Sequence, residues 1–425
     1  MKNQIKKNKE VVIFGLFIIL LASLFNAWTI TIIFSSYNAF ISSLNFRTII
    51  WVFDILCILL GYLFIRYNRK TFLSYLVRRV IKFMVAVFLI VLIFELLLRL
   101  TSSFWPLQTQ DVIFEKYTGE PGGIYFTDPR YDLQVMKPSF KQDKMFYGGR
   151  WWLHRSNKIG IRDNRDIKKA DIVLLGDSVI YGHGVNVENS LADYLDRLSG
   201  FTVANLGTQA DYPPYEYIRL KHLGLFLRPK VVLFFINGCN DGNDFAIYHP
   251  TEYFINKLIL EKAPDYSKGV EASDYLSYYK KTYPFGSIFL DNLLVYRFYH
   301  KTVKLLNKIN EYKYSPFSSE NEKLRSKIMK KILTDANRLC RINGAKLIVV
   351  FTGIDVTIHK TDPCVDFTNL CKEITNAIGV PYLDLGEESP DINFLLKDGH
   401  YSPLGNKWAA DCIWEYLKNS KLLMK

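Results

Sequence analysis

Three long apolar stretches dominate the first hundred residues. Residues 11–34 form a run without a charged side chain, and two further runs lie at 49–65, with one aspartate, and at 81–100, with charges near both ends. About 20 apolar residues are enough for a helix to cross the hydrocarbon core of a bilayer. The pattern predicts three N-terminal transmembrane helices that form a membrane anchor over residues 1–100, with a buried soluble helix as the alternative for each run.

From residue 171 onward, short apolar runs alternate with amphipathic stretches. The runs of strand length lie at residues 172–175, 201–205, 230–236, 345–351 and 381–385. The helical pattern occupies residues 188–198, 215–226, 320–343, 365–378 and 404–419. Such alternation predicts an α/β fold, with a parallel sheet of about five strands between two layers of helices. Ligands bind these sheets at the carboxyl ends of the strands, which is where functional residues are expected.

Two regions do not follow the alternation. Residues 101–163 are expected to connect the membrane anchor to an α/β domain over residues 164–425. An aromatic-rich insertion at about 245–319 separates the third strand from the next long helix. Its rings form either a lid or sugar-stacking wall over the site, or a local core.

The net charge of +13 is concentrated in the apolar N-terminal part. Residues 1–100 carry 12 Lys and Arg against 3 Asp and Glu, whereas the rest of the chain carries 42 against 38. No basic stripe is left for a nucleic acid. Basic residues precede the first apolar run and lie between the second and third, while the loop between the first and second holds only Arg47. The positive-inside rule therefore predicts a cytoplasmic N-terminus, a retained anchor without a cleavage site, and an extracytoplasmic α/β domain.

Polar motifs follow four of the predicted strands. The first strand leads into Gly176-Asp177-Ser178, the second into Asn205-Leu206-Gly207, and the third into Gly238-Cys239-Asn240-Asp241. After the fifth strand comes Asp398-Gly399-His400-Tyr401-Ser402-Pro403-Leu404-Gly405. Each motif alone is typical of an ordinary turn or helix cap. Together they place a nucleophile, oxyanion donors and a base at one edge of the sheet.

The four motifs resemble the sequence blocks of the SGNH/GDSL hydrolase family, from about Asn157 to the C-terminus. The resemblance implies a flavodoxin-like three-layer α/β/α sandwich, with Ser178 as the nucleophile and His400 as the general base. It also implies an oxyanion hole made by the N–H groups of Ser178 and Gly207 and the Asn240 amide. Such preorganised donors stabilise the tetrahedral intermediate, and a histidine held by a carboxylate activates the serine.

One departure concerns the third member of the triad. The family's acid lies three residues before the histidine, a position that Lys397 occupies here, whereas Asp398 lies two residues before His400. Asp398 is the expected acid, with a backbone carbonyl as the alternative. Among the other histidines, His183 is expected to face the mouth of the site or solvent, and the rest have no partner motif.

The cysteines and histidines show no metal-binding spacing, so no metal or cofactor is expected. Cys364 and Cys371 are close enough in sequence to form a small disulfide loop, with buried free thiols as the alternative.

The expected function is a serine esterase or deacylase that acts outside the cytoplasm on an acylated glycan, lipid or small ester. The alternatives are an O-acyltransferase in cell-surface polysaccharide modification, which would need a partner in surface-polymer assembly, and a non-catalytic glycan-binding SGNH-like module.

Overall fold

The computed structural model describes about two thirds of the chain. These residues are 9–24, 72–106, 124–128, 133–138, 141–147, 150–238, 240–242, 252–261, 319–354, 363–387, 391–396 and 398–421, with single residues and short pieces at 51–66, 264, 266 and 423. They fall into two compact units, of which the first comprises residues 1–106 and 280–308 and the second comprises residues 107–279 and 309–425.

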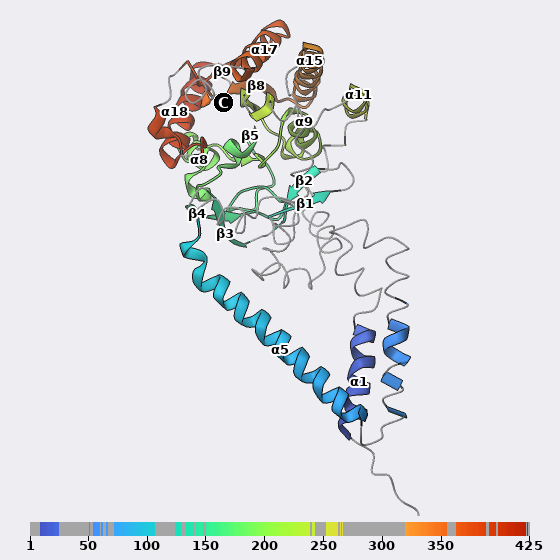
Figure 1. The fold of residues 1–425 in the computed structure, drawn as a ribbon. Helices are drawn as coiled ribbons and strands as arrows, with labels where there is room; N and C mark the ends of the chain where they lie inside the picture. The colour runs from blue at the N-terminus through green and yellow to red at the C-terminus, as the bar shows by residue number, and fades with distance from the viewer. Residues whose placement is uncertain are drawn as a thin grey trace, which may run out of the picture. The chain divides into compact units, whose positions relative to one another are not determined.

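The first unit is helical where it is described. It contains α1 (Lys9–Leu24), α5 (Phe72–Thr101) and the short 3-10 turn η1 (Ser102–Phe104) (Figure 1). Among the described residues, no helix combines the length and apolar character that crossing a bilayer requires. The three predicted spans are therefore not supported by these helices. Residues 25–50, which include part of the first predicted span, lie outside the described residues.

The second unit contains the predicted parallel sheet, in the order β6-β5-β7-β8-β9. Its strands are β5 (Ile172–Leu175), β6 (Val203–Asn205), β7 (Val231–Ile236), β8 (Lys346–Phe351) and β9 (Tyr382–Asp384). Every neighbouring pair is parallel. In chain order the arrangement is 2-1-3-4-5, the flavodoxin-like order, so this part of the predicted fold class is confirmed.

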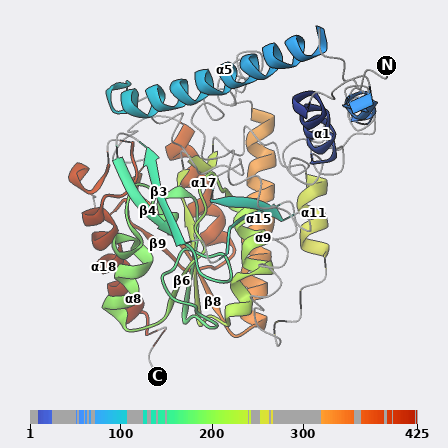
Figure 2. The same ribbon diagram turned by 90° about the horizontal axis from the view of Figure 1, so that it is seen from below.

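Helices cover both faces of the sheet (Figure 2). One face packs against α9 (Pro213–His222), α15 (Ser319–Ile342) and α17 (Pro363–Ala377). The other packs against α8 (Leu191–Ser199) and α18 (Pro403–Asn419). Side chains of a strand alternate between faces, so Val173 and Leu175 of β5 join the first core while Ile172 and Leu174 join the second. All four are fully buried, which explains their uninterrupted apolar run.

The region before the sheet has structure that its sequence pattern does not show. It forms two antiparallel hairpins, β1 (Tyr125–Asp128) with β2 (Leu133–Met136), and β3 (Lys141–Tyr147) with β4 (Arg150–Arg155). A small core joins both hairpins to the segment after β5; it contains Ile124, Tyr125, Met136, Trp152 and Tyr181. Residues expected only to connect two parts of the chain therefore pack beside the nucleophile motif.

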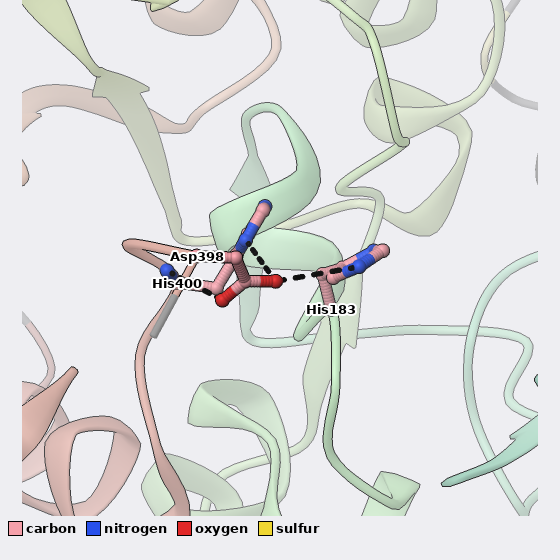
Figure 3. Close-up of side chains that lie close together, drawn as sticks. All are labelled: His183, Asp398 and His400. Atoms are coloured by element: carbon pink, nitrogen blue, oxygen red, sulfur yellow. Dashed lines mark hydrogen bonds and ion pairs between the residues drawn. The ribbon is translucent and has the colours of Figure 1, made fainter. Parts of the chain in front are cut away.

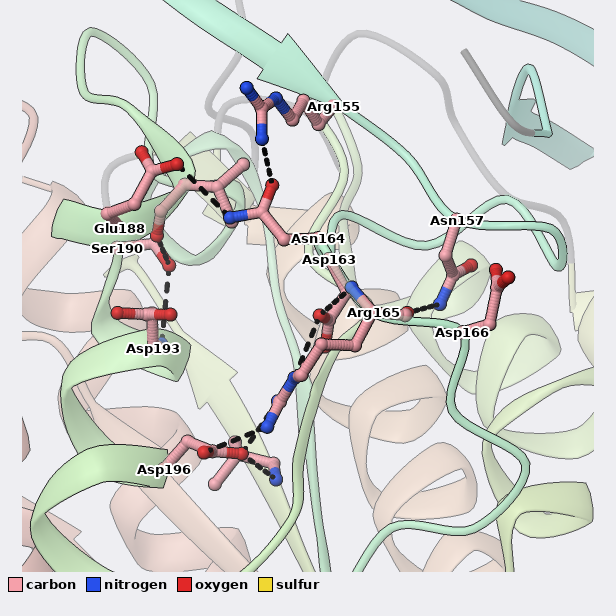
Figure 4. A network of polar contacts seen from close by, with 12 residues as sticks. Arg155, Asn157, Asp163, Asn164, Arg165, Asp166, Glu188, Ser190, Asp193 and Asp196 are labelled. Atoms are coloured by element: carbon pink, nitrogen blue, oxygen red, sulfur yellow. Dashed lines mark hydrogen bonds and ion pairs between the residues drawn. The ribbon is translucent and has the colours of Figure 1, made fainter. Parts of the chain in front are cut away.

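Polar contacts fix the segment that leads into β5. Arg165 binds Asp163 within that segment and Asp196 of α8, with its Nη2 2.7 Å from Asp196 Oδ2 (Figure 4). The buried guanidinium of Arg162 donates hydrogen bonds to the carbonyl oxygens of Tyr181, Gly182 and Val185. Buried backbone carbonyls need such partners, so these contacts hold the loop after the nucleophile in one conformation.

Most of the insertion at about 245–319 lies outside the described residues, apart from α11 (Glu252–Leu260) and a few single positions. The lid or sugar-stacking interpretation of its aromatic residues stays a prediction. Cys371 is a buried free thiol. For this residue, the structure therefore shows the free thiol and not the disulfide with Cys364.

Candidate active site

Ser178 begins a short helix at the carboxyl end of β5. This helix is α7 (Ser178–Tyr181), and Asp177 caps it by accepting a 2.8 Å hydrogen bond from the Val179 N–H. A side chain at Gly176 would come within 2.4 Å of Ile180 Cγ1. Glycine therefore allows the strand to turn tightly into the helix. The turn places the hydroxyl of Ser178 at the edge of the sheet where the sequence motifs meet.

His400 lies close enough to Ser178 to take its proton. The distance from His400 Nε2 to Ser178 Oγ is 2.8 Å. The histidine sits on a small hairpin in which Leu395 pairs with Tyr401 and the Leu396 N–H donates to the His400 carbonyl. The Tyr401 hydroxyl donates to the carbonyl of Thr352, directly after β8. The hairpin is thereby attached to the carboxyl edge of the sheet.

Asp398 reaches the imidazole from only two residues away. Its Oδ2 lies 3.2 Å from His400 Nδ1, and its Oδ1 accepts a long 3.4 Å hydrogen bond from the His400 N–H (Figure 3). Gly399 between them has φ of +86°, a left-handed conformation that glycine adopts without the steric penalty of a side chain. This bend brings the two side chains to the same side of the hairpin, so the shorter spacing still places the acid at the histidine.

The environment of Asp398 keeps its carboxyl group ionised. Burial alone would raise its pKa, but the hydrogen bonding and charge of His400, together with the neighbouring imidazole of His183, lower the pKa below its ordinary value. A carboxylate facing Nδ1 favours the tautomer with its proton there. His400 Nε2 is then left as the acceptor for the Ser178 proton.

Asn240 and Gly207, the two oxyanion-hole candidates besides Ser178, each donate a hydrogen bond to a nearby side chain. Asn240 donates through Nδ2 to Asp177 Oδ2 at 2.8 Å, and an amide nitrogen carries a second hydrogen. The Gly207 N–H donates to Asn205 Oδ1 at 2.9 Å. An oxyanion role for Gly207 therefore requires this N–H to be shared between Asn205 Oδ1 and the oxyanion. The role of both residues as oxyanion donors stays a prediction.

Gly207 has a second role that follows from its packing. A Cβ atom at this position would lie 2.3 Å from the backbone nitrogen of Tyr181 and 2.6 Å from the carbonyl carbon of Ile180. Both belong to α7, which begins at Ser178. The absence of a side chain at Gly207 therefore lets β6 and its following turn approach the nucleophile helix.

His183 is not where the sequence suggests. It is buried, with 3 % of its surface exposed, so the expectation that it faces the mouth of the site or solvent is wrong. Its ring centroid lies 4.4 Å from that of His400 and 4.7 Å from that of Trp152. The turn Gly182-His183-Gly184, in which both glycines have positive φ, folds the histidine inward. The glycines flanking it are the sequence signal for this tight turn.

One cluster of side chains offers donors that a metal ion can use. Ligand atoms of His183, Asp398 and His400 lie within 4.8 Å of one another. Imidazole nitrogens and carboxylate oxygens are typical zinc ligands. In this chain, His400 already contacts Ser178 through Nε2, and the same carboxylate–imidazole–hydroxyl arrangement performs acid–base chemistry without a metal.

No protein-family model matches the sequence. No curated protein matches it either. Solved structures do match: a lipase/acylhydrolase from Enterococcus faecalis is 16% identical, covers 59% of this chain and 95% of its own, and has a TM-score of 0.33. An esterase from Pseudoalteromonas sp. is 11% identical, with 59% and 97% covered and a TM-score of 0.34. A protein described as G-D-S-L family lipolytic, from Desulfitobacterium hafniense, is 14% identical, with 59% and 98% covered and a TM-score of 0.32.

Each of these distant structural matches covers about 60% of the chain. The substrate, the location and the roles of the residues are therefore argued from the chemistry of this chain's own side chains.

Proposed function

We propose that this protein is a serine esterase or deacylase that works through an acyl-enzyme on Ser178. The observation that carries the proposal is the 2.8 Å contact between Ser178 Oγ and His400 Nε2, with Asp398 Oδ2 3.2 Å from the opposite ring nitrogen. A serine hydroxyl is a weak nucleophile until a neighbouring base accepts its proton. This arrangement supplies the base and the carboxylate that orients it.

The reaction follows from these positions. His400 Nε2 takes the hydroxyl proton while Ser178 Oγ attacks the ester carbonyl, and the negative charge moves to the carbonyl oxygen. The bond between the acyl carbon and the alcohol oxygen then breaks, and the alcohol leaves with the proton from His400. Water, deprotonated by His400, attacks the acyl-enzyme, and the acid is released with Ser178 restored.

The proposed oxyanion donors are the Ser178 N–H, the second amide hydrogen of Asn240 and a shared Gly207 N–H. The Ser178 N–H belongs to the first turn of a helix, where N–H groups have no partner within the helix. Removing one donor of this kind typically costs about 100- to 1,000-fold in rate.

We further propose that the substrate is an acylated glycan, lipid or small ester outside the cytoplasm, and that residues 1–100 hold the enzyme at a membrane. The charge distribution supports this, because basic residues lie before the first apolar run and between the second and third. Large apolar side chains on α5 are also exposed, among them Phe83, Ile90 and Ile93.

Labelling with a fluorophosphonate probe tests the catalytic proposal. The probe reacts with serines that a neighbouring base has activated, so we expect it to label the wild-type protein and not Ser178→Ala. Ser420→Ala, which changes a serine after α18 whose hydroxyl donates to the Tyr416 carbonyl, is the matched control and should label like the wild type. A well-folded wild type that remains unlabelled would contradict an esterase and favour a glycan-binding module.

A further inference from the structure

Asp398 faces two imidazoles, although a serine triad requires only one. Its Oδ2 lies 3.2 Å from His400 Nδ1 and 3.8 Å from His183 Nε2 (Figure 3). The two histidines come from different elements, His400 from the hairpin before α18 and His183 from the turn after α7. The carboxylate is therefore held between the segment that carries the base and the segment that carries the nucleophile.

The proton of His183 can be placed from its second neighbour. Gln209 Nε2 lies 2.6 Å from His183 Nδ1. An amide nitrogen donates, so Nδ1 accepts and the proton of the neutral ring is on Nε2, which faces Asp398. With the amide reversed, Nδ1 would carry the proton and the Nε2 lone pair would face the carboxylate, an arrangement that charge repulsion disfavours.

Gln209 is itself fixed. Its side chain is buried, and its backbone N–H donates to the Tyr125 hydroxyl at 3.1 Å. Tyr125 belongs to β1, in the hairpin region before the sheet. The ring of His183 also packs against Trp152 of β4. Both hairpins that the sequence pattern does not reveal thus contribute to the position of this histidine.

The groups around His183 keep it neutral. Burial lowers its pKa well below the ordinary value, and the charges of His400 and Arg162 lower it further, while the charge of Asp398 acts in the opposite direction. A neutral His183 can direct an N–H toward Asp398 without placing a second positive charge beside the imidazolium that forms on His400 during the reaction.

Within the described part of the chain, Asp398 has few other contacts that hold it. The His400 N–H reaches it over 3.4 Å, and among the described residues His400 Nδ1 makes no well-aligned hydrogen bond despite the 3.2 Å contact. The spacing of two residues between acid and base leaves the carboxylate at the bend of its own hairpin. A contact from outside the hairpin would fix it there.

We propose that His183 is a positioning residue for the triad, whose Nε2–H holds the Asp398 carboxylate against His400. This inference rests on the esterase function proposed above. It also explains how a triad with a shortened acid-to-histidine spacing keeps its geometry. The second imidazole replaces the constraint that a longer loop would supply.

Two substitutions of His183 distinguish the contribution of its N–H group from that of its aromatic ring. His183→Phe keeps an aromatic ring against Trp152 and His400 but removes the donor. We expect the rate of Ser178 labelling to fall about tenfold or more, because the N–H 3.8 Å from the Asp398 carboxylate is lost. His183→Gln keeps an N–H near the position of Nε2 and should stay within about threefold of the wild type.

The pH profile distinguishes positioning from a loss of folding. The N–H that a neutral His183 directs at Asp398 favours the ionised carboxylate, so its removal takes away one influence that lowers the Asp398 pKa. Asp398 then becomes protonated at higher pH, so the acid limb of the labelling profile of His183→Phe should move to higher pH. A variant that is only less stable would lose active protein without moving this limb.

His222→Phe is the matched control. His222 is also buried and faces a carboxylate, with Nε2 3.5 Å from Glu261 Oε2. It lies at the C-terminal end of α9, which begins after β6 and so runs back toward the opposite edge of the sheet. We expect His222→Phe to keep the wild-type pH profile whatever it does to stability.

A double-mutant cycle with Asp398→Asn completes the test. If His183 acts through Asp398, adding His183→Phe to Asp398→Asn should lower the labelling rate by less than it does in the wild type. Equal rates and pH profiles for His183→Phe and wild type would overturn the inference and leave the esterase proposal intact, whereas an unlabelled wild type would overturn the esterase proposal first. Loss of wild-type labelling in a chelator, with recovery on adding zinc, would also overturn the inference, by making the three side chains a metal site.

Discussion

Glu216 lies in α9 with almost no exposed surface, and neither of its carboxyl oxygens has a hydrogen-bond partner among the described residues. Burial raises its pKa well above the ordinary value, and the charges of Asp241, Asp211 and Asp177 raise it further, against the opposing charge of Arg219. A carboxyl group in this environment keeps its proton to a higher pH than an exposed one does.

This proton makes the stability of the protein depend on pH. Between the unfolded pKa of about 4.3 and the raised folded pKa, the folded state holds one more proton than the unfolded state at Glu216. The stabilisation is complete below the unfolded pKa and falls by about 1.4 kcal/mol per pH unit as the pH rises toward the folded pKa. Glu216→Gln removes the titration.

We therefore expect the free energy of unfolding of Glu216→Gln to change less between pH 5 and pH 8 than that of the wild type. Urea unfolding at several pH values measures this difference. Glu415→Gln, which alters an exposed carboxyl group of α18 whose pKa is lowered by Lys418, should leave the slope unchanged over this range. Parallel curves for Glu216→Gln and wild type would show that Glu216 is ionised in the folded protein.

The residues of the site were only partly predictable from the sequence. Ser178, His400 and Asp398 were predicted from their motifs, and the structure brings them together. His183 was assigned to the mouth or solvent because its sequence neighbours show nothing of Trp152 and Gln209, which reach it from other segments. Contacts between segments far apart in the chain leave no local pattern, so such a residue is found only in the folded structure.

At the scale of elements, the approach of β6 to α7 depends on Gly207. A Cβ atom there would meet backbone atoms of Ile180 and Tyr181, and backbone cannot rotate aside as a side chain can. We expect Gly207→Ala to lower the free energy of unfolding by about 1–3 kcal/mol, as overpacking does, and to slow Ser178 labelling because α7 must shift.

Gly224→Ala provides the comparison, since the nearest atoms to its Cβ would lie 3.4 Å away or more, in ordinary contact. Thermal unfolding and the labelling rate should both distinguish the two variants. If they behave alike, the close packing at Gly207 does not constrain the nucleophile helix.

The strands of the sheet were predictable because burial on both faces makes them continuously apolar. The predicted run 172–175 is identical to β5. The predicted runs 230–236 and 345–351 each begin one residue before β7 and β8 and end with them. The hairpin strands before the sheet lack this signal. Strand β4 has alternating exposed and buried positions, with Trp152 and His154 inward, and the strand is short, so its period of two is hard to recognise in a single sequence.

At the scale of the whole molecule, the alternation of strands and helices predicted the parallel sheet, and the family resemblance implied its flavodoxin-like arrangement. The location of the protein, by contrast, did not follow from the structure. The charge asymmetry of residues 1–100 predicts a cytoplasmic N-terminus and an extracytoplasmic α/β domain. An enzyme reporter fused after Lys425, one that is active only outside the cytoplasm, should be active in cells. A reporter that is active only in the cytoplasm would contradict the proposed location.

The nucleophile and the base are separated by 222 residues of chain, and this separation has a consequence for biosynthesis. A nascent chain that has emerged as far as α17 already contains Ser178, but it still lacks the His400 imidazole that contacts the Ser178 hydroxyl in the folded protein. The proposed ester chemistry therefore requires the hairpin that carries His400 to leave the ribosome and dock at the end of β8. An unfinished polypeptide is expected to be inactive toward esters.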